Sequence, residues 1–491
     1  TLFRSLVPTF NKTILHLERR FPPFPPAVGN ELIGEDIFMS NKKPTSNRKS
    51  DLSRRQFIGL GAAGVATAAV GGMGRRAYAG TEADGRPYTM VRTAEHFGDE
   101  EIKLTFPAGW EVETSRMVGH DAPALTDDQI RAAIRNTIGT PRLADLADGK
   151  QKVAITFDDL TRPTPTGRIV PFVLEELHAA GIKKEQIIFQ GSFGSHAAMF
   201  QQDMAAKIGA DIVANYECWN HDCFHGFTDF GTTDGGLPVK LSSRFGEADL
   251  KICLSGIKKH GLAGFGGGAK AVIPGVAAFE SITHLHSVLG RDHPHGIAHV
   301  NSGVRLELEK AARLAGVDQS INIVMNGHRQ VAGVHAGDIV EAHRSAVRAA
   351  FTAYQTELPK DNDVVVMNHY PQSVEAYFGF APKAMKDGGT VVLIQDTPAG
   401  QRKIHYLGWS GNGGNRTRPE KGLPVGNAGQ VIIFNRWPAM WDETKYSTDV
   451  HFASTWDHVE TLIRDFHGPT GKAVVFPTGP LSIEPDVSLR I

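Results

Sequence analysis

The chain has 491 residues, more than one average domain, so two domains with additional segments are expected. Hydrophobic residues make up 41% of the chain and charged residues 21%, a balance typical of a globular protein with a substantial core. The formal net charge is -1, and this lack of a basic surplus argues against nucleic acid or an anionic membrane surface as a partner.

The first part of the chain is interpreted as a targeting region. Residues 1–52 are rich in Pro, Asn, Lys and Ser without sustained periodicity; we expect them to be disordered or misassigned, with Met39 as an alternative start. Residues 53–79 begin with Ser-Arg-Arg-Gln-Phe-Ile, continue through small, weakly apolar residues and end at Ala77-Tyr78-Ala79. This pattern predicts a twin-arginine signal peptide with an A-x-A cleavage site.

A membrane anchor is the alternative for this segment. Its apolar run is shorter than the roughly 20 strongly apolar residues that a span needs, so no stable anchor is expected. We therefore expect export of the folded protein by the twin-arginine machinery, and a mature periplasmic chain that begins near Gly80.

Strands and helices alternate along the rest of the chain, which predicts parallel βαβ units. We expect an N-terminal α/β domain over residues 80–354, a polar linker over 355–363, a smaller α/β domain over 364–473, and a tail over 474–491 whose strand 474–476 returns to the first domain. The active site is expected in the cleft of this two-domain α/β fold. The predicted strands cover residues 152–157, 186–190, 211–216, 250–254, 321–325, 364–367, 390–394 and 431–434. The predicted helices cover residues 126–138, 167–180, 201–208, 305–315 and 336–354.

Polar motifs follow three of the predicted strands. Asp158-Asp159-Leu160-Thr161-Arg162-Pro163 follows the first, Gly194-Ser195-His196 the second, and a glycine-rich loop the strand 250–254. Because open parallel sheets bind ligands beyond the carboxyl ends of their strands, these three loops are expected to converge on one ligand.

The glycine-rich loop holds five glycines between His260 and Lys270, among them Gly266, Gly267 and Gly268. Glycine lets a backbone approach a bound group closely and adopt positive φ angles. A nucleotide P-loop is excluded, because it needs Gly-Lys followed by Ser or Thr, and here alanines flank the lysine. A tight strand-to-helix turn without a ligand stays open as an alternative.

Together, His260, Lys270 and the later His286 resemble the nickel-pincer-nucleotide-dependent lactate racemase (LarA) family. In that family a histidine precedes the glycine loop, the lysine is covalently joined to the pyridinium ring of the pincer, and a later histidine ligates nickel. The matching positions are His260, Lys270 and His286, and His284 is interpreted as a bystander. The resemblance implies an isomerase, a racemase or epimerase of a 2-hydroxy acid, that depends on the enzymes that make the pincer cofactor.

The same resemblance assigns roles to the strand-end motifs. Asp159, Thr161 and Arg162 match a signature at the cofactor and substrate, although an exposed Asp159–Arg162 ion pair is the simpler interpretation. His196 and His260 match the two catalytic histidines, which act as acid and base on opposite faces of the reacting carbon. The family usually follows the first histidine with an arginine-containing stretch, whereas this chain has two alanines there.

The second domain departs from the family. Lactate racemases carry Gln and Lys, three residues apart, after a Tyr-Pro segment; here Tyr370-Pro371 is present, but the aligned positions hold Phe378 and Ala381. We therefore expect a substrate that is larger or less charged than lactate, in a pocket lined by Tyr370, Phe378 and Trp456.

Two other functions are weighed against a racemase. An exported nickel or cofactor carrier without catalysis would explain the missing carboxylate-binding pair. A zinc protein would use the cluster Cys218, His221, Cys223 and His225, although that spacing matches no common structural site. The cysteines number three, so a Cys218–Cys223 bridge and buried free thiols both stay open.

Overall fold

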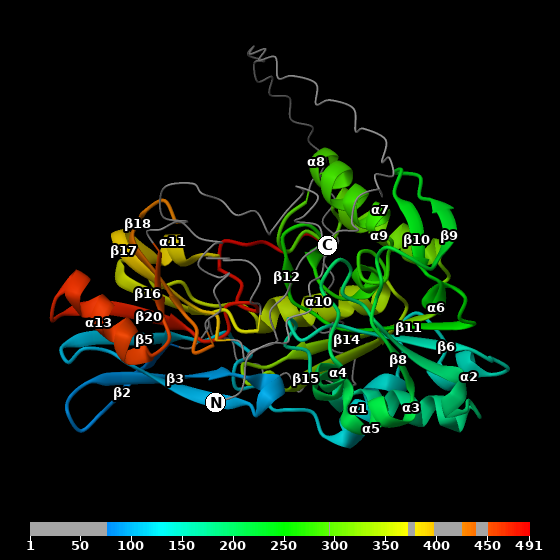
Figure 1. Cartoon of the computed structure of the whole chain (residues 1–491), viewed down its shortest axis with the longest axis horizontal. Helices are drawn as coiled ribbons and strands as arrows, with labels where there is room; N and C mark the ends of the chain where they lie inside the picture. The colour runs from blue at the N-terminus through cyan, green and yellow to red at the C-terminus, as the bar shows by residue number, and fades with distance from the viewer. Residues whose placement is uncertain (1–75, 294, 372–378, 397–424, 438–449) are drawn as a thin grey trace, which may run out of the picture. The chain divides into compact units, whose positions relative to one another are not determined.

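Two sheets of mostly parallel strands organise the part of the chain that the computed structural model describes (Figure 1). The described residues are 76–293, 295–371, 379–396, 425–437 and 450–491. One sheet has six strands and the other has seven, and helices connect the strands of both. This is the mixed α/β fold that the sequence predicts.

The six-stranded sheet has the order β15-β14-β11-β6-β7-β8, in which β15 alone runs antiparallel to its neighbour. Every residue of β6, β7, β11 and β14 is buried, as expected for strands covered on both faces. The strands are β6 (Val153–Phe157), β7 (Ile187–Gly191), β8 (Glu217–Trp219), β11 (Leu250–Gly256), β14 (Gln319–Met325) and β15 (Val331–Gly337).

Helices cover both faces of this sheet, and alternate residues of a strand belong to different hydrophobic clusters. Ile155 packs in the cluster that contains residues of α1 (Asp127–Arg135), α3 (Val170–Ala179) and α10 (Glu341–Ala353). Ala154, the preceding residue, packs in the cluster that contains residues of α9 (Gly303–Leu314). Successive side chains of a strand point to opposite faces of the sheet, so these two residues pack in two different cores.

The direction of chain travel reverses between β6 and β11. From β6 the chain moves outward to β7 and β8, and it then returns to the other side of β6 to form β11 and β14. The loops that leave the carboxyl ends of β6 and β11 consequently diverge, and such a switch point leaves a crevice for a ligand.

Two helix boundaries and one element differ from the sequence predictions. The capping box of Thr126 and Gln129 is confirmed, but α1 ends at Arg135, and Ile138 instead pairs its backbone with that of Gly337. The strand predicted at residues 211–216 is wrong: α5 (Ala210–Asn215) continues from α4 (Gln201–Ile208) after a bend at Gly209, whose φ is 107°. The signal of the β-branched Ile-Val pair was outweighed by this helical context.

The helix predicted from residue 336 begins later. Residues 331–337 form β15, and α10 starts only at Glu341. A carboxylate oxygen of Asp338 accepts hydrogen bonds from the backbone N–H groups of Val340 (2.9 Å) and Glu341 (3.1 Å). Asp338 thus satisfies donors at the start of the helix, which fixes the boundary between strand and helix.

The seven-stranded sheet has the order β1-β5-β20-β16-β17-β18-β19, with β1 antiparallel to β5 and all other pairs parallel. Helix α13 (Trp456–His467) packs against it (Figure 1). The strands are β1 (Arg76–Tyr78), β5 (Trp110–Ser115), β16 (Asn362–Asn368), β17 (Met385–Ile394), β18 (Ala428–Phe434), β19 (Val450–Ala453) and β20 (Gly471–Phe476).

Membership of this sheet differs from the predicted domain boundaries. β5, which lies within the predicted domain of residues 80–354, pairs with β20, and β20 lies between β5 and β16. The residues after β20 return to that predicted domain, since the Arg490 N–H donates to the Ala298 carbonyl (3.0 Å). Strands that are distant in sequence pair in the same sheet, so no single boundary along the chain separates the two sheets.

The remaining described elements are short. They are β2 (Gly80–Thr81), β3 (Pro87–Thr93), β4 (Glu100–Thr105), α2 (Leu143–Ala147), β9 (Phe227–Thr232), β10 (Pro238–Ser242), α6 (Ser243–Gly246), β12 (Lys259–His260), β13 (Gly264–Phe265), α7 (Phe279–His284), α8 (Gly290–Asp292) and α11 (Ala381–Ala384). Within the described ranges, no helix combines the length and apolar character that crossing a bilayer requires.

The predicted export signal lies mostly outside the described residues. Ala77 and Tyr78 of the predicted cleavage motif are described, and they form part of the edge strand β1, in which the Tyr78 side chain is 87% exposed. The twin-arginine pair itself lies outside the described part of the chain, so the signal peptide stays a prediction.

Candidate active site

A pocket opens at the carboxyl ends of β6, β7 and β11, at the switch point of the six-stranded sheet. It encloses about 580 Å³ of free space, its open mouth included. The loops after the three strands and the glycine-rich loop line it together. The predicted site residues among its lining are Asp159, Arg162, His196, His260, Gly266, Gly267 and Lys270.

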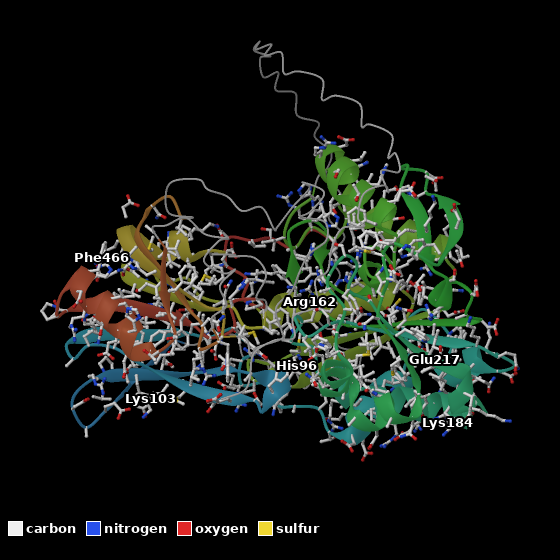
Figure 2. The ribbon with its side chains drawn as sticks, in the orientation of Figure 1. His96, Lys103, Arg162, Lys184, Glu217 and Phe466 are labelled. Carbon is white, nitrogen blue, oxygen red and sulfur yellow. The ribbon has the colours of Figure 1, made fainter. Side chains whose placement is uncertain are left out.

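The loop after β6 is held by a buried lysine that the sequence analysis did not single out. Lys207, from α4, lies 2.8 Å from a carboxylate oxygen of Asp158. Its amine also donates to the carbonyls of Arg162 and Thr164, both at 2.9 Å. His96 adds a contact to the Arg162 carbonyl at 3.3 Å, and Figure 2 labels both of these residues. These bonds fix the loop backbone and turn Asp159 and Arg162 toward the pocket.

His196 and Asp159 form a buried pair on the pocket wall. Nδ1 of His196 lies 2.6 Å from Oδ2 of Asp159, and the side chains are 11% and 6% exposed. Oδ1 of the same carboxylate accepts a hydrogen bond from the Thr161 backbone N–H (3.1 Å). An ionised carboxylate accepts the Nδ1 proton, so the neutral ring carries its lone pair on Nε2, the arrangement of a general base oriented by an aspartate.

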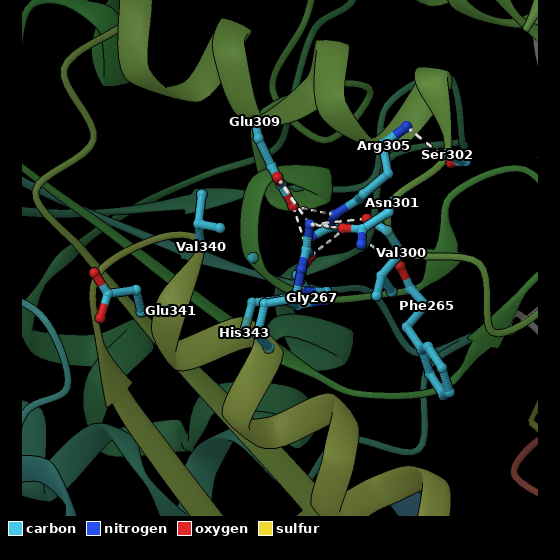
Figure 3. A network of polar contacts seen from close by, with 12 residues as sticks. Phe265, Gly267, Val300, Asn301, Ser302, Arg305, Glu309, Val340, Glu341 and His343 are labelled. Atoms are coloured by element: carbon cyan, nitrogen blue, oxygen red, sulfur yellow. Dashed lines mark hydrogen bonds and ion pairs between the residues drawn. The ribbon is translucent and has the colours of Figure 1, made fainter. Parts of the chain in front are cut away.

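The glycine-rich loop is held from behind by side chains of other elements (Figure 3). The guanidinium of Arg305, which is fully buried and paired with Glu309 at 2.9 Å, donates to the Gly267 carbonyl at 3.3 Å. His343 contacts the Gly266 carbonyl at 3.0 Å, and the Gly268 N–H donates to Asn322 at 2.9 Å.

Positive φ angles of 81° at Gly267 and 53° at Gly268 allow the loop to turn onto these supports, where a Cβ would collide with its neighbours. Arg305, Asn322 and His343 escaped the sequence analysis because they lie on α9, β14 and α10, far away in sequence, without a local motif.

His260 lies at the pocket with its ring fixed by the backbone. Its Nδ1 accepts hydrogen bonds from the N–H groups of Leu262 and Ala263, both at 3.2 Å. Burial, followed by the charges of Lys270, Lys258, Arg162 and His286, lowers the pKa of His260 well below its ordinary value. The ring is therefore neutral, with its proton on Nε2, so His260 is prepared as a hydrogen-bond donor whereas His196 is prepared as an acceptor.

Lys270 lines the pocket, and the pKa of its side-chain amine is lowered. In the described part of the chain its side chain makes no hydrogen bond or ion pair, although it is only partly exposed. Burial, with the charges of Arg162 and Arg305, lowers the pKa of Lys270 to about 7. A large fraction of the amine is consequently neutral near pH 7, which is the nucleophilic form.

This pKa gives a prediction that needs no cofactor. Acetic anhydride is expected to acetylate Lys270 with a rate that rises through pH 7, because the neutral amine reacts. Half-buried Lys240, whose pKa is raised by Glu280, is expected to react only at much higher pH. Peptide mapping by mass spectrometry between pH 5 and 10 would measure both profiles, and identical profiles for the two lysines would contradict the low pKa.

His286 lies beside the pocket rather than in its lining. It belongs to a single π-helical turn, Leu285–Leu289, that continues α7, and its Nδ1 contacts the Ile282 carbonyl at 2.7 Å. A π-helical turn inside a helix often marks a functional site. The charge of His286 acts on the pKa of His260, so the two rings lie within electrostatic range.

Several predicted site residues lie elsewhere. Thr161 contacts Asp159 instead of lining the pocket, and Gly268 packs against Arg305 and His343. Trp456 lies in the core of the seven-stranded sheet against Phe106 and Phe434, and its indole N–H donates to the Thr105 carbonyl at 2.6 Å.

Tyr370 also lies away from the pocket lining, and it is 1% exposed beneath the guanidinium of Arg329. Phe378 lies outside the described residues. Neither Tyr370 nor Trp456 therefore supports the predicted substrate wall.

The cluster from Cys218 to His225 does not converge on a metal position. Nε2 of His221 contacts the Ala277 carbonyl at 2.8 Å, and His225 is an exposed partner of Asp222. All three cysteines are unpaired thiols, which excludes the disulfide, and burial raises their pKa values. The predicted zinc site in this cluster is therefore not supported.

The charges of the pocket favour an anionic ligand. The carboxylate of Asp158 is paired with Lys207, and that of Asp159 is paired with His196. The Arg162 guanidinium, in contrast, forms no ion pair with a described carboxylate. Arginine binds carboxylates and phosphates through paired hydrogen bonds, so Arg162 can hold either group.

Comparison with known proteins shows a similarity to lactate racemases. Residues 97–296 match the lactate racemase N-terminal domain. The lactate racemase of Thermoanaerobacterium thermosaccharolyticum is 28% identical over 335 residues, which cover 66% of this chain and 76% of that enzyme. The lactate racemase of Lactiplantibacillus plantarum is 28% identical over 295 residues, or 57% of this chain and 69% of that enzyme. Residues 97–296 thus form a lactate racemase N-terminal domain, and the chain is similar to lactate racemases over more than half of its length.

The fold agrees with that of two solved structures. The lactate racemase apoprotein of Thermoanaerobacterium thermosaccharolyticum matches with a TM-score of 0.56 at 21% identity, covering 81% of this chain and 100% of that one. A Thermotoga maritima protein matches with a TM-score of 0.53 at 17% identity, covering 74% of this chain and 99% of that one. These similarities indicate an isomerase of the racemase or epimerase kind.

Proposed function

We propose that this protein inverts the configuration at C2 of a 2-hydroxy acid, with a nickel pincer nucleotide attached at Lys270 and its nickel ligated by His286. The observation that carries the proposal is the meeting of His196, His260 and Lys270 in one pocket, although they come from loops that are far apart in sequence. A non-catalytic carrier would need the lysine but would not need two histidines in different tautomers.

The pocket residues fit such a cofactor. Lys270 offers an amine with a pKa of about 7 and no partner among the described side chains. The hydroxyl oxygen of Ser255, also in the lining, is buried without a hydrogen-bond partner in the described structure, and Arg162 is available for a phosphate. Imidazole is a suitable ligand for nickel, which favours His286 at the pocket edge. When bound, the cofactor would supply the acceptor for the Cα hydride.

The two histidines would accept and donate the protons of the reaction. His196, oriented by Asp159, would take the hydroxyl proton through Nε2 as the Cα–H bond breaks, which leaves a 2-keto acid. On the opposite face, His260 would first take a proton from solvent at Nδ1, with loss of its two backbone contacts. Its Nε2–H would then pass to the keto oxygen as the hydride returns to C2, while His196 releases its proton to solvent. The reverse turnover exchanges these roles, so the neutral His260 must then accept a proton. This step requires the other tautomer and the loss of its two backbone contacts.

Arg162 would bind an anionic group of either the cofactor or the substrate. The substrate is proposed to be a 2-hydroxy acid other than lactate, because this chain lacks the Gln and Lys pair of the family. Ala381, one of the aligned positions, is a buried residue of α11 and brings no charge.

The place of action is proposed to be the periplasm. The support is the twin-arginine motif and the A-x-A sequence, and this pathway transports proteins that have already folded around their cofactor. A mature chain with the cofactor in place would then be the exported form.

A panel of enantiopure 2-hydroxy acids tests this function. The protein, produced together with the pincer biosynthesis enzymes, is expected to invert at least one acid larger than lactate, as measured by chiral chromatography. The His196→Ala variant is expected to retain nickel and to lose this activity. If the loaded wild-type protein left every acid unchanged, racemisation would be excluded, and if lactate were its best substrate, the proposed substrate class would be wrong.

A further inference from the structure

Three side chains that can bind a metal ion lie together outside the pocket. His120 and Asp121 follow β5 on the segment that leads to α1, and His328 lies in the turn between β14 and β15. One ligand atom from each lies within 4.8 Å of the other two. In the described ranges of the chain, no other set of three His, Cys, Asp or Glu side chains meets this spacing. None of the three residues lines the pocket.

The geometry suits a single ion. Nε2 of His328 lies 3.5 Å from Oδ1 of Asp121, and the ring centres of His120 and His328 are 5.0 Å apart. Zinc ligands bind at about 2.0–2.2 Å in a tetrahedron, so neighbouring ligand atoms stand roughly 3.3 Å apart. The second oxygen of Asp121 faces Arg116 at 3.9 Å, so one oxygen serves the ion while the other keeps its cation.

The surroundings of the His120 ring favour a role as a metal ligand. It is 8% exposed, and its Nδ1 is buried without a hydrogen-bond partner in the described structure. Its ring lies against the backbone of Gly327, where any Cβ would collide with it. A buried ring nitrogen without a hydrogen bond is rare and calls for a partner.

The site lies where the chain crosses from one sheet to the other. The N–H groups of Val118 and Gly119 donate to the carbonyls of Gln355 (2.8 Å) and Ala353 (2.7 Å), which join these two crossing segments. The residue after His328 is Arg329, whose guanidinium lies 4.8 Å from the centre of the Tyr370 ring. An ion held by His328 would fix this turn against the crossing.

We propose that His120, Asp121 and His328 bind one Zn²⁺ ion, with water as the fourth ligand, and that this ion fastens the β14–β15 turn to the crossing segment. The ion is a structural one, and it is separate from the nickel of the proposed cofactor.

Zinc binding by the untagged protein produced without the pincer enzymes tests the proposal. After treatment with a chelator, the protein is dialysed against Zn²⁺ and its metal content is measured by mass spectrometry. One Zn²⁺ per chain and a higher thermal midpoint are expected. His328→Ala and Asp121→Asn, at positions that are partly or fully exposed, are each expected to weaken zinc binding by about 10-fold or more. His225→Ala is the matched control, because it removes an exposed histidine that is also paired with an aspartate.

The outcomes separate this site from the others. Zinc that is retained in His328→Ala and Asp121→Asn, or lost in His225→Ala, would overturn the assignment, as would a wild-type protein that binds no zinc. His286→Ala is expected to bind zinc normally. Because the experiment uses no cofactor and no substrate, failure of the zinc site would leave the proposed racemase untouched, and failure of the racemase would leave the zinc site.

Discussion

Replacement of Lys270 by alanine is expected to reduce racemisation by roughly 10⁴-fold or more, because the proposed cofactor would carry the hydride chemistry and side chains cannot replace it. The low pKa of this amine, about 7, and its lack of a partner among the described residues leave covalent attachment as its simplest role. Chiral chromatography of the best 2-hydroxy acid would measure the loss. The intact mass of the variant is expected to equal that of the unmodified chain.

Lys270→Arg is the matched control for charge. Arginine keeps a cation in the pocket, but it stays protonated and is not a nucleophile. If Lys270 acts only as a positive charge, the arginine variant should retain most activity, and this result would contradict covalent attachment. If Lys270 is the attachment point, the arginine variant should be as inactive as the alanine variant. Lys240→Ala, at a half-buried lysine outside the pocket lining, is expected to behave as wild type.

The second large effect is expected at the His196–Asp159 pair. Asp159→Asn should lower kcat by about 10²–10⁴-fold, because an amide no longer favours the tautomer that leaves the lone pair on Nε2. His196→Asn should lose a similar factor. The chain offers a matched control in Asp222→Asn, which changes an aspartate paired with an exposed histidine at 3.2 Å and should leave kcat unchanged.

The histidines can be told apart by half-reactions. In His260→Asn, His196 still takes the proton from one enantiomer, so a single turnover should release keto acid from that enantiomer alone. In His196→Asn the opposite enantiomer should react, and more slowly, because His260 is neutral with its Nδ1 occupied by two backbone N–H groups. Acid quenching and keto acid analysis would measure this. Equal keto acid formation from both enantiomers in either variant would contradict the assignment of one histidine to each face.

Local patterns in the sequence predicted the site residues that follow the ends of the strands. Buried apolar runs identified β6, β7 and β11, and the polar residues after them are Asp159, His196 and the glycine-rich loop. Because parallel strands end at one edge of a sheet, the order of strands and motifs along the chain is enough to place these residues together. The pocket lining confirms that they meet.

The supports of the site could not be predicted in this way. Lys207, Arg305 and His343 act on backbone carbonyls of loops that are distant in sequence, and nothing near them marks that contact. The pairing of β5 with β20 is likewise a long-range choice between buried faces. Trp456 was placed in the pocket by resemblance alone, whereas its position at the start of α13 buries it in the core of the seven-stranded sheet.

Intact mass and metal content of the chain, produced together with the pincer biosynthesis enzymes, test the central claim most directly. The account predicts a covalent adduct that maps to Lys270, with one nickel per chain, and loss of the nickel in His286→Ala. An unmodified Lys270 without nickel, under conditions that load a known lactate racemase, would contradict it. The proposed reaction would then have no hydride acceptor.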